Sequence, residues 1–533
     1  MTGRGSVIVR APSTHRHRPP SQAAPLPDGH LRGRAMDATV SSSRRRGHGC
    51  LLRLAVVAAF VLGAPRAEAG SSGGDRVLLN VESLFPGPSS CATPQEHETS
   101  AATSARMKIV HRHGPCSPLA DAHRNPPSHA EILAADQSRV ESIQHRVSAT
   151  TTGELTKRAA HVQPSQKKSP GHSPSSSSTP SLPASSGSAL STGNYVVTIG
   201  LGTPALPQTV VFDTGSDTTW VQCRPCVVKC YKQKQPLFDP AKSSTYANIS
   251  CADPACADLD ESGCSDGHCL YGIQYGDGSS TVGFFAQDTL TISHDAIKGF
   301  RFGCGEKNSG LFGKAAGLMG LGRGKTSLTV QASNKYGGAF SYCLPASSSG
   351  TTGYLDFGPG AAPANARLTT PMLTDKGATF YYVSLTGIRV GGQQVSIPES
   401  IFSTAGTLVD SGTVITRLPA TANATLSSAF DAGMATLGYK RAPAFSILDT
   451  CYDFTGVSEA ALPAVSLVFQ GGASLDVNAS GIMFPVSQAQ VCLAFASNGD
   501  DSSVGIIGNT QQKTHGVLFD LGKKTVAFAR GAC

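Results

Sequence analysis

Residues 211–220 read Val-Phe-Asp-Thr-Gly-Ser-Asp-Thr-Thr-Trp, a hydrophobic run that delivers the carboxylate of Asp213 into a turn. Gly215 allows that turn without a Cβ clash, and small hydroxyl residues flank it. Residues 406–413, Gly-Thr-Leu-Val-Asp-Ser-Gly-Thr, repeat the same pattern around Asp410. One Asp-hydroxyl-Gly turn occurs easily by chance, but two copies predict two equivalent half-structures whose acids face one cleft.

The basic charge of the chain lies outside the part that carries these turns. The sequence has 533 residues, enough for more than one domain, and a formal net charge of +8. Residues 191–533 hold 22 Lys plus Arg and 24 Asp plus Glu, a net −2, whereas the residues before 191 hold 22 and 12, a net +10. Basic excess favours nucleic acid or anionic membranes. The near-neutral part with the Asp turns is therefore not expected to read DNA.

The N-terminus has the pattern of a targeting sequence. Arginines at 44–46 precede an apolar run at 51–62, and Ala-Glu-Ala at 67–69 matches the small-x-small pattern of a secretory cleavage site. The apolar run is too short to span a bilayer comfortably. Met36 lies at the distance before this run that is usual for the first residue of a signal peptide, so we expect translation to begin at Met36. An organellar transit peptide in residues 1–46, which are rich in Arg, Ser and Pro, is the alternative.

The next zone, residues 70–190, is interpreted as a pro-segment with a linker. One stretch, 129–147, has a mildly helical pattern. The Ser, Pro, His and Lys residues of 162–188 cannot bury enough apolar surface to fold. Such a linker is open to proteolysis, and we expect cleavage before Ser191.

Histidines are concentrated in this pro-segment. It holds 11 Lys plus Arg, 9 Asp plus Glu and 8 His, so its formal charge rises from +2 towards +10 as the histidines are protonated. We expect this change to strengthen its attraction to the catalytic region at mildly acidic pH, and protonation of carboxylates to release it at lower pH. Scattered, solvated histidines are the alternative interpretation. The candidate switches are His111, His113, His123 and His129.

Residues 191–533 are predicted to be all-β. Short runs rich in Val, Ile, Leu, Phe and Tyr are separated by Gly, Pro, Asn and Asp, which is the pattern of strands joined by turns. Helical patterns are brief and occur at 327–332 and 420–437. This zone is long enough to hold two hydrophobic cores. The expected strands include 194–200, 208–212, 289–293, 380–390 and 524–529.

Cysteine usage indicates an oxidising compartment. Twelve of the 15 cysteines follow Ser191, and an even number behind a secretory signal predicts six disulfides. Cys223-x-x-Cys226 followed by Cys230 is also compatible with part of a zinc site, but no coherent second pair follows, so we expect no metal. The Asn-x-Ser/Thr acceptors for glycosylation are Asn248, Asn423 and Asn478.

The paired Asp turns and the motifs around them resemble pepsin-like aspartic proteases, most closely the plant nepenthesin-type branch. Residues 271–280, Tyr-Gly-Ile-Gln-Tyr-Gly-Asp-Gly-Ser-Ser, resemble the flap hairpin of the family. Residues 316–320 and 505–509 resemble the hydrophobic-hydrophobic-Gly segments behind the two catalytic loops. The cysteine-rich stretch 223–269 points to the nepenthesin branch, and 107–117 resembles pro-segments of plant members.

The resemblance implies a bilobal pepsin-like fold, with two related β-lobes and the active-site cleft between them. Its catalytic pair would be Asp213 and Asp410, which share one proton because two close carboxylates cannot both ionise cheaply. The ionised member would activate a water while the protonated member donates to the scissile carbonyl. Peptide hydrolysis by this route needs no cofactor.

The resemblance also assigns supporting roles within the loops. Thr214 and Ser411 would cross-link the two turns, while Ser216 and Thr413 would hydrogen-bond the outer oxygens of the carboxylates. The full set of supporting residues is Thr214, Gly215, Ser216, Ser411, Gly412 and Thr413.

The flap would carry Tyr275 and Gly276 over the substrate. The indole of Trp220, the only tryptophan, would hydrogen-bond Tyr275. The alternatives are a hairpin aromatic beside a tight turn for Tyr275 and simple core filling for Trp220.

The expected organisation is an N-terminal extension and signal peptide at 1–69, a pro-segment and linker at 70–190, an N-terminal lobe at 191–365 and a C-terminal lobe at 366–533. Connectivity cannot be derived from cysteine positions alone. The disulfides implied by the resemblance are Cys223–Cys226, Cys230–Cys304, Cys251–Cys269, Cys256–Cys264, Cys343–Cys533 and Cys451–Cys492.

The predicted function is that of an aspartic endopeptidase made as a zymogen, secreted or vacuolar, and acting as a monomer on proteins and peptides. Pepstatin-like compounds should inhibit it, and neither a membrane span nor nucleic acid binding after maturation is expected. One alternative is a catalytically weak inhibitor on the same fold, like plant xylanase inhibitors. The other is a chloroplast nucleoid DNA-binding protease, which would need the basic extension to survive maturation.

Overall fold

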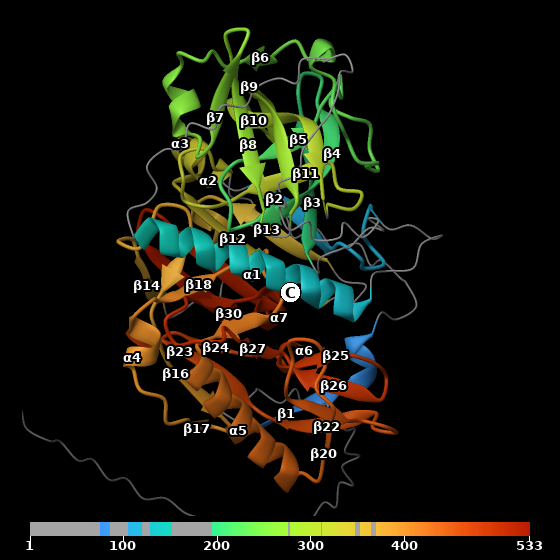
Figure 1. Cartoon of the computed structure of the whole chain (residues 1–533), viewed down its shortest axis with the longest axis vertical. Coiled ribbons are helices and arrows are strands. Elements are labelled where there is room, and N and C mark those ends of the chain that lie inside the picture. The colour runs from blue at the N-terminus through green and yellow to red at the C-terminus, as the bar shows by residue number, and fades with distance from the viewer. Residues whose placement is uncertain are drawn as a thin grey trace, which may run out of the picture. The chain divides into compact units, whose positions relative to one another are not determined.

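The computed structural model describes residues 75–85, 105–119, 128–151, 194–275, 278–310, 312–346, 352–363 and 369–533. All of them belong to one compact unit, Gly70–Cys533. They form two β-rich lobes with a long helix between them (Figure 1). The predicted signal sequence, the linker at 162–188, His123 and Gly276 lie outside the described residues.

The N-terminal lobe is built around long antiparallel hairpins. Strands β9 (Ser280–Ile292) and β10 (Asp295–Ser309) pair along most of their length, and β8 (His268–Gln274) adds to β9 as the predicted flap hairpin. The other elements of this lobe are β3 (Tyr195–Leu201), β4 (Leu206–Asp213), β5 (Trp220–Gln222), β6 (Ala247–Asn248), β7 (Ser262–Ser265), β11 (Gly317–Gly320), α2 (Leu328–Gln331) and α3 (Ser333–Tyr336).

A six-stranded antiparallel sheet joins the lobes, in the order β2-β13-β12-β29-β30-β14. Its edge strand β2 comes from the predicted pro-segment and buries Ala105, Met107 and Ile109 on one face, as period-2 alternation requires. The predicted pro-segment therefore supplies part of the folded core. The strands are β2 (Ala105–His111), β12 (Ala339–Cys343), β13 (Gly353–Phe357), β14 (Thr369–Leu373), β29 (His515–Asp520) and β30 (Thr525–Arg530).

The C-terminal lobe contains an inner set of short strands and two four-stranded sheets, ordered β17-β16-β23-β24 and β20-β21-β26-β25. The helix predicted at 420–437 is α5 (Ala420–Thr436), which buries Leu426, Phe430 and Met434. The inner strands are β15 (Tyr382–Val383), β18 (Thr407–Val409), β19 (Thr416–Leu418), β27 (Phe495–Ser497) and β28 (Gly505–Ile507). The sheet strands are β16 (Leu385–Val390), β17 (Gln393–Gln394), β20 (Lys440–Ala442), β21 (Cys451–Asp453), β23 (Val465–Phe469), β24 (Ser474–Asp476), β25 (Met483–Pro485) and β26 (Gln490–Leu493).

Short elements complete the C-terminal lobe and the connections. Strand β1 (Arg76–Asn80), also from the predicted pro-segment, pairs with β22 (Glu459–Pro463). The remaining elements are α4 (Ser400–Ser403), α6 (Ala479–Ile482), α7 (Asn509–Gln512) and the 3-10 turns η1 (Val81–Leu84), η2 (Pro240–Lys242), η3 (Pro254–Asp258), η4 (Pro359–Ala361) and η5 (Gln470–Gly472).

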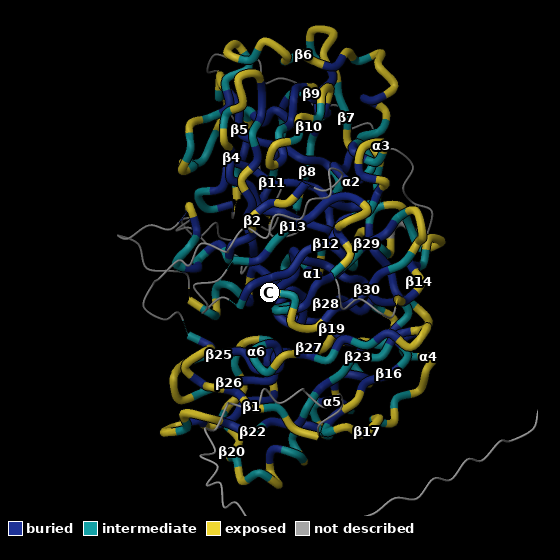
Figure 2. The backbone as a smooth tube through the Cα atoms, turned by 180° about the vertical axis from the view of Figure 1, so that it is seen from behind, coloured by how far each residue is buried: buried dark blue, intermediate teal, exposed yellow. Residues whose placement is uncertain are grey.

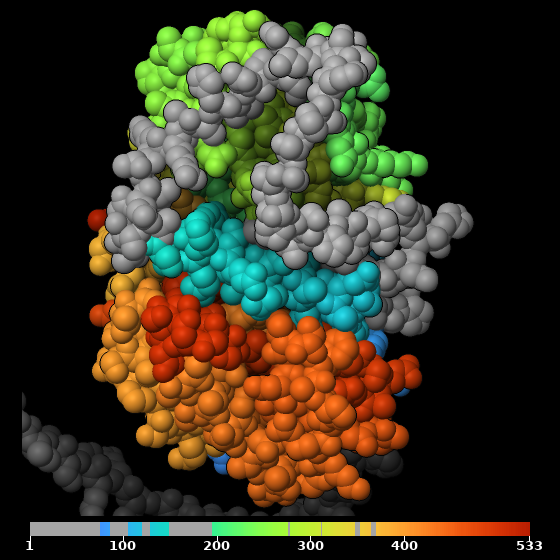
Figure 3. Space-filling model, viewed as in Figure 1, coloured from blue at the N-terminus to red at the C-terminus, as the bar shows by residue number. Residues whose placement is uncertain are grey.

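Helix α1 (His129–Thr151) lies between the two lobes (Figures 1 and 3). It begins with a capping box, because the Ser128 hydroxyl accepts the Glu131 amide at 3.3 Å while the Glu131 carboxylate accepts the Ser128 amide at 2.9 Å. Its buried side chains follow helical spacing and include Leu133, Val140 and Ile143. Helix α1 thus packs as an amphipathic helix against the rest of the molecule.

Buried residues are concentrated where the joining sheet and the inner strands meet (Figure 2). One large apolar cluster extends through both lobes, from Val210 and Phe212 of β4 to Phe519 and Val526 of the joining sheet. Within the described residues, no helix is both long and apolar enough to cross a membrane.

Two of the implied disulfides, Cys343–Cys533 and Cys451–Cys492, are present in the structure. The second joins residues that face each other in the register of β21 and β26. Four implied pairings are wrong: Cys223–Cys226, Cys230–Cys304, Cys251–Cys269 and Cys256–Cys264. The observed bonds are Cys223–Cys304, Cys226–Cys230, Cys251–Cys264 and Cys256–Cys269.

Strand register explains these corrections. Strand β5 pairs in parallel with β10, with Val221 opposite Cys304, so Cys223 lies within bonding reach of Cys304. Cys230 is then left to close a small loop with Cys226. The other two bonds each join residues 13 apart and run side by side, because Cys264 and Cys269 face each other in the β7–β8 hairpin.

Candidate active site

Asp213 and Asp410 occupy equivalent positions in the two lobes. Asp213 ends β4, which pairs in parallel with β11, and the chain returns from the turn as β5 on the other side of β11. Asp410 follows β18, which pairs in parallel with β28, and the chain returns as β19 on the other side of β28. The predicted segments 316–320 and 505–509 thus run behind the two turns, and each carboxylate is delivered by the same local fold.

Each carboxylate is held by one backbone amide and one hydroxyl. The Asp213 oxygens accept the Gly215 amide at 3.0 Å and the Ser216 hydroxyl at 2.8 Å. The Asp410 oxygens accept the Gly412 amide at 3.0 Å and the Thr413 hydroxyl at 2.6 Å. Both aspartates are 1% exposed. These donors fix the rotation of each carboxylate in place.

The two turns are cross-linked below the carboxylates. The Thr214 amide donates to the Ser411 hydroxyl at 3.1 Å, and the Ser411 amide donates to the Thr214 hydroxyl at 2.9 Å. The glycines permit the close approach, because a Cβ on Gly215 would lie 2.8 Å from an oxygen of Asp410. A Cβ on Gly412 would collide with the carboxylate of Asp213. Each turn therefore needs a glycine beside the opposite acid.

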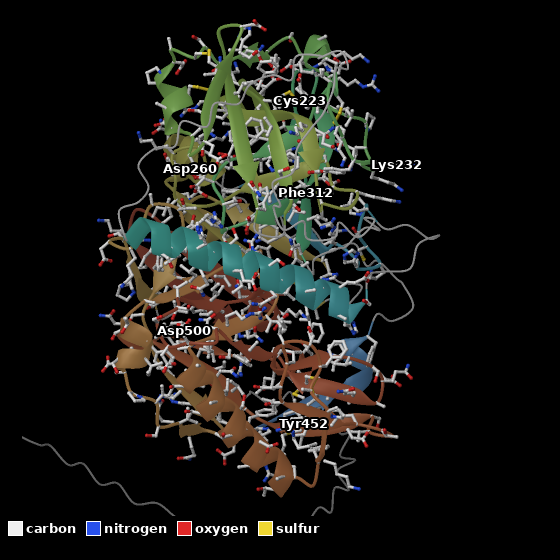
Figure 4. All side chains as sticks on the ribbon, in the orientation of Figure 1. Cys223, Lys232, Asp260, Phe312, Tyr452 and Asp500 are labelled. Carbon is white, nitrogen blue, oxygen red and sulfur yellow. A yellow bond between two sulfur atoms is a disulfide. The ribbon has the colours of Figure 1, made fainter. Side chains whose placement is uncertain are left out.

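The flap tyrosine and the single tryptophan are in contact, as the resemblance implied. The Trp220 indole donates to the Tyr275 hydroxyl at 2.9 Å. Both rings pack edge-on against Phe312, at 4.7 Å from Trp220 and 5.6 Å from Tyr275. Phe312 lies in the N-terminal lobe beside α1 (Figure 4). Tyr275 is thus held in place by Trp220 and Phe312.

The space between the two carboxylates is occupied by Arg139 of α1, which sequence reasoning missed. Its guanidinium nitrogen Nη2 lies 2.7 Å from Asp213 Oδ1 and 2.9 Å from Asp410 Oδ2, and its Nε donates to Asp410 Oδ2 at 3.2 Å. The Arg139 side chain is 15% exposed. A fork of five N–H donors matches a pair of carboxylates.

The guanidinium changes the protonation of the acid pair. Burial alone would raise the pKa of Asp213, but Arg139, the Ser216 hydroxyl and the Gly215 amide outweigh it and bring the pKa below its ordinary value. The same two carboxylates raise the pKa of Arg139 despite its burial. In the described structure Asp213 is therefore ionised and paired with a permanent cation. In this state Asp213 cannot donate the proton that hydrolysis requires.

A second buried ion pair lies one helical turn before Arg139. Asp136 of α1 is paired with Arg417 of β19 at 3.0 Å, and both side chains are fully buried. Sequence reasoning missed this pair too. The available signal was the spacing of Leu133, Asp136, Val140 and Ile143, which puts an acid in the apolar stripe of a helix.

The histidine switch is not supported at His111. This residue ends β2 beside Tyr195, with ring centroids 5.2 Å apart. Loss of solvent around its ring, together with His113, Lys513 and Arg112, lowers the pKa of His111 well below its ordinary value. Protonation would thus weaken the attachment of β2, whereas we expected it to strengthen the attraction.

The three glycosylation acceptors differ in exposure. Asn248 and Asn478 are exposed, and the Asn478 side chain caps the short helix α6. Asn423 is 2% exposed inside α5, so the folded chain cannot present it to an enzyme. A glycan on Asn423 would be incompatible with the packing of α5, and the sequon alone does not report this burial. Among the described residues, no three His, Cys, Asp or Glu side chains form a candidate metal site.

Two cross-linked Asp-hydroxyl-Gly turns that face one cleft between two β-lobes define the class of aspartic proteases. Residues 195–359 match the family described as Xylanase inhibitor N-terminal, and residues 380–530 match Xylanase inhibitor C-terminal. An aspartyl protease family protein of Arabidopsis thaliana is 44% identical over 466 residues, which cover 86% of this chain and 93% of that protein. Aspartyl protease AED1 of the same plant is 41% identical over 475 residues, covering 89% and 96%.

Two further matches are more distant, and the second of them is a likeness of fold alone. Aspartic proteinase nepenthesin-2 of Nepenthes gracilis is 35% identical over 352 residues, which cover 64% of this chain and 78% of that protein. The crystal structure of conglutin gamma, a basic 7S globulin from lupine seeds, is similar in fold, with a TM-score of 0.51, 22% identity and coverage of 63% and 91%. The chain belongs to the plant pepsin-like aspartic proteases, and its class of enzyme is the aspartic-type endopeptidase.

Proposed function

We propose that the protein is made as an inactive precursor and hydrolyses peptide bonds at acidic pH with Asp213 and Asp410 as its catalytic pair. The observation that carries this proposal is the equivalence of the two buried carboxylates, each held by one amide and one hydroxyl and cross-linked through Thr214 and Ser411. An inhibitor on the same fold has no need of this arrangement.

Once α1 leaves, the two carboxylates face each other without Arg139. Two like charges at close range disfavour double ionisation, so the pair holds one proton between them. The ionised acid takes a proton from a water, which attacks the scissile carbonyl carbon, while the protonated acid donates to the carbonyl oxygen. The acid that took the proton from water then gives it to the amide nitrogen as the C–N bond breaks, and the other carboxylate takes back the hydroxyl proton of the intermediate as the carboxyl product forms, which restores the shared proton. Fixed hydroxyl and amide donors keep both carboxylates in the required orientation.

In the precursor, α1 prevents this reaction in two ways. Its backbone lies between the lobes, where an extended substrate must enter (Figure 3). Its Arg139 also neutralises the acid pair and occupies the position of the reacting groups. Removal of the helix is therefore required for activity. The linker that follows it, 162–188, is the place where we expect the chain to be cut.

The six disulfides of the described residues are consistent with folding in an oxidising compartment. Together with the signal-like N-terminus, they favour secretion or delivery to the vacuole. The protein would then meet the acidic pH that its chemistry needs.

Single substitutions at the two acids test the proposal. Full-length protein is activated by acid and assayed on peptides with and without pepstatin. Asp213→Asn and Asp410→Asn should each lower kcat by at least about a thousandfold, and the double variant should be little worse, because the acids act as one unit. Circular dichroism should show that each variant remains folded. Near-normal turnover by either single variant would refute the mechanism.

A further inference from the structure

The carboxylate of Asp136 occupies a pocket made entirely of hydrogen-bond donors. Its Oδ1 accepts the Val414 amide at 2.6 Å, and its Oδ2 accepts the Ile415 amide at 3.1 Å and the Arg417 guanidinium at 3.0 Å. Asp136 is 1% exposed. Two converging amides and a guanidinium form a binding site for a carboxylate.

The donors of this pocket belong to the catalytic domain, whereas the acid belongs to the removable helix. Val414 and Ile415 directly follow the turn that carries Asp410, and Arg417 lies in β19 opposite Ile506 of β28. These residues remain when α1 leaves. The pocket is therefore part of the C-terminal lobe, and only its occupant is lost.

Arg417 has few partners apart from α1. Its Nη1 donates to the Ile415 carbonyl at 3.2 Å, and its Nη2 contacts Asp136 and, at 3.4 Å, Gln137 of the same helix. Of the carboxylates in the described part of the chain, only that of Asp136 pairs with Arg417. Its Nε has no hydrogen-bond partner among the described residues. Loss of α1 leaves a guanidinium and two amides facing the cleft without an anion.

The distance between the pocket and the acid pair limits which substrate residue can reach it. Asp136 precedes Arg139 by three residues, which corresponds to about 4.5 Å along a helix axis. An extended peptide advances about 3.3 Å per residue. Consider a substrate whose scissile bond lies where Arg139 lies. The substrate residue whose side chain is near the pocket will then be about one to two residues from that bond.

We propose that this pocket is a substrate subsite that selects an Asp or Glu side chain about one to two residues from the scissile bond. The inference rests on the proposed catalytic pair, because that pair locates the scissile bond. In the precursor, Asp136 mimics the side chain that the subsite will later bind. Charge-assisted hydrogen bonds of this kind correspond to a preference for Asp over the isosteric Asn of about 10- to 100-fold.

The test uses the acid-activated protein and a set of peptides that carry Asp or Asn at each position on both sides of one scissile bond. At about pH 5, kcat/KM should favour Asp by about 10- to 100-fold at one position within about two residues of that bond. Equal turnover of the Asp and Asn peptides at every position would overturn the proposal.

A substitution and a binding measurement complete the experiment. Arg417→Gln should reduce the Asp/Asn ratio to about one, and Arg417→Lys should keep part of it. If Arg417→Gln does not fold, the peptide scan with the unchanged protein still decides the question. Peptides with a reduced, uncleavable bond at the scissile position should show the same Asp preference in calorimetry. Binding preference without hydrolysis would refute the catalytic proposal alone, and hydrolysis without preference would refute the subsite alone.

Discussion

Replacing Arg139 should open the precursor without altering its catalytic residues. Arg139→Met keeps an apolar stem in the cleft but removes every contact with Asp213 and Asp410, the shortest of which is 2.7 Å. Truncating one partner of a buried, hydrogen-bonded charge pair costs about 2–5 kcal/mol. Because the acid pair regains a shared proton and solvent, we expect the lower part of this range, about 2–3 kcal/mol.

This free-energy cost determines how much the population of the open precursor, with α1 undocked, should increase. At about 1.4 kcal/mol per factor of ten, the open fraction should rise about 30- to 150-fold. Pepstatin should bind only the open form, so its apparent Kd should fall by the same factor. The measurement is made just above the pH at which the precursor begins to process itself.

Arg146→Met is the matched control. It removes the same charge from the same helix, but the Arg146 guanidinium contacts the Gly215 carbonyl at 3.4 Å and the Phe380 ring rather than the two acids. We expect it to change the apparent Kd by less than about threefold, because a single contact to a carbonyl at 3.4 Å is a weak hydrogen bond. If Arg139→Met binds pepstatin as weakly as the unchanged precursor, Arg139 does not hold the cleft closed.

Three further predictions follow from the protonation and exposure of named groups. The guanidinium of Arg139 lowers the pKa of Asp213, so it stabilises docking of α1 above the pKa of the free acid pair. This stabilisation is lost as the pH falls through the lowered pKa of Asp213. Conversion of the precursor, followed on gels, should therefore accelerate below about pH 4, and a rate independent of pH would contradict this. Because the pKa of His111 is lowered, β2 docking loses stability progressively as the pH falls below about 6.5. His111→Gln should therefore flatten the pH dependence of precursor stability between about pH 5 and 6.5 in thermal melts, and an unchanged slope would exclude this role. Mass spectrometry of glycopeptides from a eukaryotic host should find glycan on the exposed Asn248 and Asn478 and none on Asn423, and a modified Asn423 would mean that the glycan is added before α5 folds.

Much of the fold and of the acid pair could be predicted from the sequence because their signals are local. Turn chemistry around Asp213 and Asp410 is written within a few residues of each acid. Alternating apolar runs indicated the β-lobes, and an Ala-rich stretch after Pro419 indicated α5. The expected contacts of Thr214 with Ser411 follow from the same two turns.

The residues that close the cleft were decided only by tertiary structure. Nothing near Arg139 in the sequence marks it as the partner of two acids 74 and 271 residues away, because that contact depends on how α1 docks. The pairing of Cys223 with Cys304 likewise depends on the register of β5 against β10. Asn423 is buried inside α5 although its sequon is intact. In each case the decisive quantity is the position of distant chain segments relative to one another, which local sequence patterns do not specify.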